Sequence, residues 1–180
     1  MIDKSITLAS SDFELFNVPQ QFSQDHVALD TRWKQLQREA HPDNFAAQGA
    51  SAQRLAMQWS VRINEAYQRL KDPLKRAAQL CELGGSPINA ENNTAMPMHF
   101  LMQQMEWREQ LDAATSGAEV AALSAEVQVD KREVIARCED LLDRQHDLAQ
   151  AVGQVRALMF IERFCDDIDT RLEHFEALPQ

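Results

Sequence analysis

Apolar residues recur every three or four positions over most of the chain, and this spacing predicts amphipathic α-helices. The stripe of residues 25–40 consists of Leu29, Trp33, Leu36 and Ala40, and that of residues 51–71 consists of Leu55, Trp59, Ile63, Ala66 and Leu70. No segment alternates β-branched with polar residues in the manner of a strand. The pattern therefore predicts an all-α fold.

Prolines, glycines and capping residues indicate where these helices begin and end. Pro73 suits the first turn of a helix, and Gly84-Gly85 suits the end of the same helix. Seven helices are predicted, at about residues 12–18, 25–40, 51–71, 73–84, 98–114, 118–145 and 148–177. The short connections between the last three predict antiparallel neighbours in a three-helix bundle.

One segment between the predicted helices has the composition of a linker. It reads SPINAENNTAMP, which is rich in Ser, Pro and Asn and has no apolar periodicity. The sequence therefore predicts an N-terminal domain of residues 1–84, a linker of residues 85–97 and a C-terminal domain of residues 98–180.

Composition and charge narrow the class of protein. With 44% hydrophobic and 26% charged residues, the chain is typical of a helical globular protein. The net charge of −10 lies entirely in residues 85–180, because basic and acidic residues balance in residues 1–84. Such an acidic chain is not expected to bind nucleic acid. No stretch resembles a membrane span, and MIDKSITLAS lacks the layout of a secretory signal, so we expect a cytoplasmic protein without a membrane partner.

The three cysteines of the chain are far apart and form no CxxC pair. Cys81, Cys138 and Cys165 each fall within a helical pattern, where free cysteine commonly acts as a small core residue. We therefore expect no metal site, no redox centre and no cofactor.

His41-Pro42-Asp43 lies between the two long helical patterns of the N-terminal half. Pro42 removes a backbone N–H and biases the residue before it away from helix, so the first helix should end near His41. The imidazole and the carboxylate are then held at an exposed hinge. The cations Arg32, Lys34 and Arg38 are expected to project away from the apolar stripe. They form either an ordinary solvated face or, together with the hinge, a docking surface for an acidic partner.

Two other readings of His41 are possible. It can simply cap the preceding helix, or it can form an acid/base pair with Asp43. Catalysis needs an oriented pair in a pocket beside a nucleophile or a metal, and an exposed loop offers no such enclosure. The sequence also has no serine elbow, no metal-spaced His/Glu cluster and no glycine-rich phosphate loop. We therefore do not expect an enzyme.

A second candidate site lies in HFLMQQMEWREQLD, where a helix would carry two apolar faces. Phe100, Trp107 and Leu111 fall on one face. Met98, Leu101, Met102 and Met105 fall on another, bordered by Glu106 and Glu109. Two apolar faces indicate either a fully enclosed helix or a helix whose second face meets another protein. Methionine suits an adaptable binding surface, and glutamate is rarely buried without a partner.

WKQLQREAHPDNF followed by a long helix resembles the J-domain, the module that docks on DnaK-type chaperones and stimulates their ATPase. The resemblance implies that His41, Pro42 and Asp43 are essential for docking, and that Lys34 and Arg38 belong to the surface that steers the encounter. Asn44 stands where many members have a basic residue, and Ala40 where an aromatic one is usual.

FLMQQMEWREQLD after a J-domain resembles the C-terminal domain of the HscB family of co-chaperones in iron–sulfur cluster assembly, and the likeness covers essentially the whole chain. The resemblance implies an IscU-like scaffold protein and an HscA-like chaperone as partners. The scaffold-binding positions that it implies are Leu101, Met102, Met105, Glu106, Glu109 and Phe160. Trp107 and Met105 replace leucines that are common in the family. The alternative is a general J-domain co-chaperone whose acidic bundle holds another client.

Overall fold

In the computed structural model, which describes residues 6–89 and 98–177, the chain is helical and the described residues contain no strand. This confirms the predicted all-α class. The helices are α1 (Asp12–Phe16), α2 (His26–Glu39), the 3₁₀ helix η1 (Pro42–Gln48), α3 (Ala50–Lys71), α4 (Pro73–Leu83), α5 (Met98–Ala113), α6 (Gly117–Glu139), the π-helical turn η2 (Asp140–Gln145) and α7 (Leu148–Glu176).

Contacts within the chain divide it into two compact units, Met1–Arg76 and Ala77–Gln180. The division falls inside α4. Within the segment predicted as a linker, Ile88 is buried, and its carbonyl oxygen accepts hydrogen bonds from Nε (2.9 Å) and Nη2 (2.6 Å) of Arg156 in α7. Residues 90–97 of that segment lie outside the described residues. The predicted domain limits stay a prediction.

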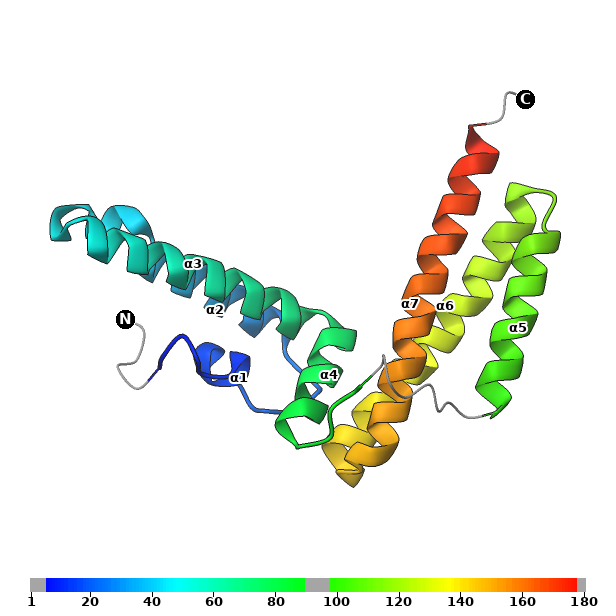
Figure 1. Cartoon of the computed structure of the whole chain (residues 1–180), viewed down its shortest axis with the longest axis horizontal. Coiled ribbons are helices and arrows are strands. Elements are labelled where there is room, and N and C mark those ends of the chain that lie inside the picture. The colour runs from blue at the N-terminus through cyan, green and yellow to red at the C-terminus, as the bar shows by residue number, and fades with distance from the viewer. Residues whose placement is uncertain (1–5, 90–97, 178–180) are drawn as a thin grey trace. The chain divides into compact units, whose positions relative to one another are not determined.

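The first unit is built on an antiparallel hairpin of α2 and α3, with α1 packed against it (Figure 1). Leu29 and Leu36 of α2 and Ile63 and Leu70 of α3 are fully buried between the helices. A polar row runs beside this core: the indole N–H of Trp33 donates to Asn64 over 2.8 Å, and the Trp33 ring stacks on Tyr67 at 4.9 Å between centroids. The hairpin is therefore held along its length by apolar burial and by directional contacts.

α1 is fixed to α3 by a buried carboxylate. Oδ1 of Asp12 lies 2.6 Å from Nη1 of Arg62, and Oδ2 lies 2.7 Å from Nε of Arg69. Burial alone raises the pKa of Asp12, but the hydrogen bonds and charges of Arg69 and Arg62 outweigh it and hold this pKa below its usual value. Asp12 is therefore ionised, and it joins two arginines that lie about two helical turns apart on α3.

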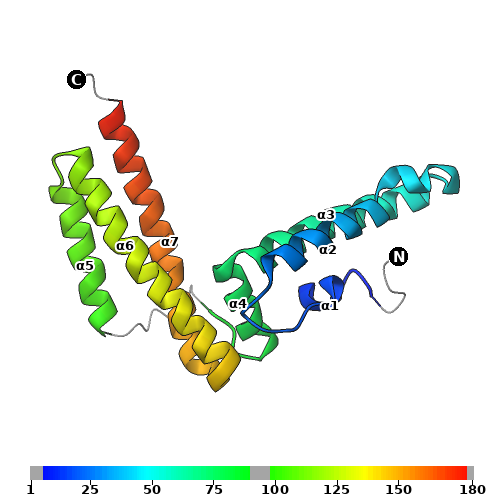
Figure 2. The same ribbon diagram turned by 180° about the vertical axis from the view of Figure 1, so that it is seen from behind.

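The second unit contains the bundle of α5, α6 and α7, which lie side by side in both views (Figures 1 and 2). Its core contains Trp107, Val120, Val127, Ile161, Phe164 and Ile168, all nearly or fully buried. The helix predicted at 118–145 is α6 continued by η2. It ends at His146, whose left-handed backbone (φ 54°) stops it, and Asp147 then caps α7.

Candidate partner-binding sites

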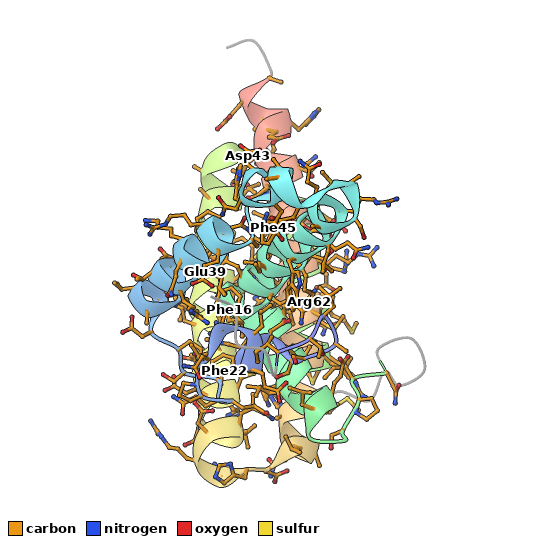
Figure 3. All side chains as sticks on the ribbon, turned by 90° about the vertical axis from the view of Figure 1, so that its left-hand side faces the viewer. Phe16, Phe22, Glu39, Asp43, Phe45 and Arg62 are labelled. Carbon is orange, nitrogen blue, oxygen red and sulfur yellow. The ribbon has the colours of Figure 1, made fainter. Side chains whose placement is uncertain are left out.

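The His41-Pro42-Asp43 turn lies at the end of the α2–α3 hairpin, where His41 and Asp43 are exposed and Pro42 is half-buried. The side chain of His41 is 58% exposed and that of Asp43 is 89% exposed. Figure 3 looks onto this unit with Asp43 labelled near the cyan segment. Nδ1 of His41 accepts a hydrogen bond from the backbone N–H of Asp43 over 3.3 Å, so His41 caps η1, the helix that follows, and not the helix before it. In the neutral ring the proton is then on Nε2.

Two side chains hold this turn in place from outside it. The amide of Asn44 donates to the backbone carbonyl oxygen of Arg38 over 2.7 Å, and Oγ of Ser60 in α3 donates to the carbonyl oxygen of Ala40 over 3.1 Å. The last turn of α2 thus gains partners for carbonyl groups that the helix itself leaves unsatisfied. The turn is exposed but is fixed by hydrogen bonds on both sides.

An apolar hollow of about 590 Å³ lies beside Ala40 and beneath η1. It is lined by Glu39, Ala40, Phe45, Gln48, Ala52, Leu55, Ala56 and Trp59. The small side chain of Ala40 leaves this space, which an aromatic residue at the same position would partly fill. Sequence reasoning noted Ala40 as a departure from the family pattern but did not predict the hollow.

The three cations of α2 do not share one surface. Lys34 and Arg38 are exposed and four residues apart, so they lie on the same face of the helix. Arg32 is half-buried and stands about 200° around the helix from Lys34. The expectation that Arg32 projects away from the apolar stripe is therefore wrong, because its position borders the buried face between Leu29 and Leu36. Its part in chaperone binding stays a prediction.

The second candidate site is the outer face of α5, here called the methionine stripe and defined by Met98, Leu101, Met102 and Met105. Their exposed fractions are 72%, 37%, 66% and 64%, respectively. The opposite face holds Phe100, Trp107 and Leu111, all buried in the core. The sequence left two alternatives for this helix, full enclosure or a second face that meets another protein. Full enclosure is wrong, because one face of α5 is exposed within its own unit. Glu106 and Glu109 are exposed along the stripe.

Phe160 of α7 lies partly in the core and partly at the surface. Its ring meets Phe100 edge to face at 5.9 Å between centroids and stacks on Phe164 at 6.1 Å. The contact with Phe100 brings Phe160 to α5, the helix that carries the methionine stripe. Arg108 lies over the same ring at 5.7 Å. Sequence reasoning missed Arg108, although its position seven residues after Leu101 places it at the edge of the stripe.

The cysteines behave as core groups. Burial raises the pKa of the Cys81 thiol to about 11 and that of Cys138 to about 12, and it also raises the pKa of Cys165. Among the described residues, no three His, Cys, Asp or Glu side chains are grouped so that they could hold a metal ion. Across residues 6–89 and 98–177, none of the helices combines the length and the hydrophobicity needed to cross a bilayer.

Comparisons with known proteins agree with each other. The family model described as the HSCB C-terminal oligomerisation domain matches residues 96–169. A co-chaperone protein HscB homolog from Burkholderia multivorans is 48% identical over 174 residues, which cover 95% of this chain and 99% of the relative. The structure of the chaperone HscB from Vibrio cholerae is 34% identical with a TM-score of 0.78 and covers 92% of this chain and 99% of its own. The crystal structure of the human co-chaperone protein HscB is 26% identical with a TM-score of 0.85, over 91% and 82% of the two chains.

Proposed function

Because this chain belongs to the family of HscB co-chaperones, we propose that it binds an IscU-like scaffold protein of iron–sulfur cluster assembly and brings it to an HscA-like chaperone of the DnaK type. It then stimulates the ATPase of that chaperone and so aids the maturation of iron–sulfur proteins. The chain acts by binding and not by covalent chemistry. It needs no cofactor, since the cluster belongs to the scaffold.

One observation carries this proposal: each of the two units presents an exposed candidate contact surface. The first unit presents the His41-Pro42-Asp43 turn, and the second presents the methionine stripe. Exposed groups of this kind add little to the stability of their own unit. Their exposure is therefore better explained by contact with other proteins.

The first surface supports docking on the chaperone. The turn displays an imidazole, a rigid ring and a carboxylate on a backbone that Asn44 and Ser60 hold still. A fixed turn loses little conformational freedom on binding, which favours affinity. Lys34 and Arg38 attract an acidic partner and speed its encounter, and salt weakens that attraction.

The second surface supports binding of the scaffold. Leu101, Met102 and Met105 offer apolar area that is removed from water on binding, which is the main source of affinity at such surfaces. Unbranched methionine side chains adapt to the shape of a partner. Glu106 and Glu109 beside them select a partner with a basic complement.

Delivery of the scaffold to the chaperone then depends on one chain carrying both surfaces. A scaffold bound to the second unit is held near a chaperone bound to the first, so its effective concentration at the chaperone rises without any new contact. The experiment that tests the proposal is a steady-state ATPase assay of the purified HscA-like chaperone with this chain, with and without the IscU-like scaffold.

We expect the full chain to stimulate hydrolysis alone and to stimulate it further when the scaffold is present. Stimulation that never depends on the scaffold would show a J-domain co-chaperone for another client. Absence of any stimulation would contradict the proposal altogether.

A further inference from the structure

Arg108 lies at the edge of the methionine stripe and reaches from α5 to α7. Its guanidinium carbon is 5.7 Å from the ring centroid of Phe160 and 5.8 Å from that of Phe164. Nη2 of Arg108 lies 3.6 Å from Oδ2 of Asp167, and about half of the Arg108 side chain is exposed. Arg108 therefore links two helices through two rings and one carboxylate.

These contacts surround Phe160 on the sides that face its own unit. Phe100 of α5 meets the ring edge to face, with 87° between the ring planes, and Phe164 stacks on it with 11° between the planes. A cation within about 6 Å of a ring centroid is attracted by the ring, and edge-to-face pairs are favourable in the same way. The Phe160 ring is thereby held in one orientation while part of it stays at the surface.

Asp167 explains why Arg108 stays over the rings. It follows Phe164 by three residues and Phe160 by seven on α7, so the three side chains share one face of that helix. Its carboxylate draws the guanidinium toward this face. The positive charge of Arg108 is thus matched inside the unit, even though Glu106 and Glu109 on the same helix are exposed.

The alternative is that Arg108 contacts the partner directly. The partner proposed above carries a basic complement to Glu106 and Glu109, and a free cation beside those carboxylates would repel it. Arg108 instead stacks on Phe160 and pairs with Asp167, so its charge is neutralised within the unit and does not repel a basic partner.

We infer that Arg108 is a positioning residue, which fixes the ring of Phe160 in the orientation that the scaffold protein contacts. The inference rests on the proposed function, because it concerns how the same surface binds the IscU-like scaffold. Fixing an aromatic side chain before binding removes the loss of rotamer freedom that binding would otherwise require.

The test is a double-mutant cycle for scaffold binding, measured by calorimetry with the full chain and the purified IscU-like protein. We expect Arg108→Ala to weaken binding roughly three- to tenfold. This size is typical of one cation–aromatic contact together with the restriction of the Phe160 ring that the contact causes. In the background of Phe160→Leu, the same change should have no further effect. Arg108→Lys should restore part of the affinity, because it keeps the charge but loses the planar group. Arg132→Ala is the control, since it removes an exposed cation of the same unit on α6.

Aromatic NMR of the free protein gives a second readout that does not need the scaffold. Arg108→Ala should cause averaging or broadening of the Phe160 ring signals and leave those of the buried Trp107 unchanged. Wild-type affinity in Arg108→Ala, or losses from Arg108→Ala and Phe160→Leu that simply add, would overturn the inference. So would an unaltered Phe160 signal. If the wild-type chain does not bind the scaffold at all, the proposed function fails, and the NMR result still decides whether Arg108 orders Phe160.

Discussion

The side-chain amide of Asn44 donates a hydrogen bond to the backbone carbonyl oxygen of Arg38, with 2.7 Å between nitrogen and oxygen. This bond ties the start of η1 to the last turn of α2 and spans the His41-Pro42-Asp43 turn. Many J-domains carry a basic residue at the position of Asn44. In this chain the position instead helps to hold the turn, and we propose that the steering charge comes from Lys34 and Arg38.

Asn44→Ala should weaken chaperone docking by loosening the turn. One lost hydrogen bond of this kind is worth about 1 kcal/mol, so the concentration for half-maximal ATPase stimulation should rise roughly fivefold. Ser60→Ala, which removes the bond to the carbonyl oxygen of Ala40, should have an effect in the same direction. Unchanged titration curves for both variants would show that the turn needs neither bond.

His41→Gln should abolish ATPase stimulation and leave the fold intact. The imidazole is mostly exposed, so its loss should change the free energy of unfolding by less than about 0.5 kcal/mol. Scaffold affinity should equal that of the wild type, because the change lies in the other unit. An ATPase titration beside a thermal melt checks both points, and stimulation near the wild-type level would remove the role proposed for the turn.

Replacing Leu101 and Met102 together by alanine should lower scaffold affinity by roughly tenfold or more, since a few apolar residues carry most of the energy of such contacts. Both side chains are exposed, so the melting temperature should hardly change. Trp107→Ala is the matched control on the buried face of the same helix, and it should lower the free energy of unfolding by about 3–5 kcal/mol. Early melting of the Leu101/Met102 variant would show that these residues belong to the core.

Asp12→Asn should destabilise the first unit in a pH-dependent way. The folded-state pKa of Asp12 lies below its ordinary value of 3.8, so its stabilising effect is present above that value and is lost as the pH falls through the folded-state pKa. At pH 7 we expect Asp12→Asn to lower the free energy of unfolding by about 2 kcal/mol. This is less than the loss expected for a fully buried ion pair, because Arg69 is partly exposed. Urea unfolding at pH 7 and near pH 3 measures this, with Asp112→Asn as an exposed control. If the difference in free energy of unfolding between the wild type and Asp12→Asn is the same at both pH values, the lowered pKa of Asp12 is contradicted.

The three thiols should react slowly while the protein is folded. The pKa of Cys81 is raised by burial to about 11 and that of Cys138 to about 12, so at pH 8 almost no thiolate is present at either residue. Cys165 is only half-buried and should react first. The kinetics of a thiol reagent, with and without urea, check this order. Rapid modification of Cys138 in the folded protein would contradict it.

Local patterns in the sequence were enough to predict the helices and the faces of α5. The 3.6-residue period separates Trp107 from Met102 without any structure, and Pro42 alone indicates where α2 ends. The same pattern did not reveal η1, because its shape depends on Asn44 reaching back to Arg38 and on α3 lying beneath it. The spacing of apolar residues along the sequence does not indicate such contacts between segments.

The candidate site residues show the same limit. Arg32 was grouped with Lys34 because both are basic. The direction in which a side chain points depends on its position around the helix, and that position puts Arg32 beside the buried face of α2. The family resemblance alone pointed to Phe160, and it did not indicate that the ring is half-buried against Phe100. Its partner Arg108 could be recognised only after α5 and α7 were placed side by side.

The central claim is that one chain must carry both surfaces. The most direct test mixes two variants in one ATPase assay, His41→Gln, which should still bind the scaffold, and the Leu101/Met102 alanine variant, which should still dock on the chaperone. Because the gain comes from holding both partners on one molecule, the mixture should fall well short of the scaffold-dependent stimulation given by the same amount of wild-type chain. Full stimulation by the mixture would contradict the account.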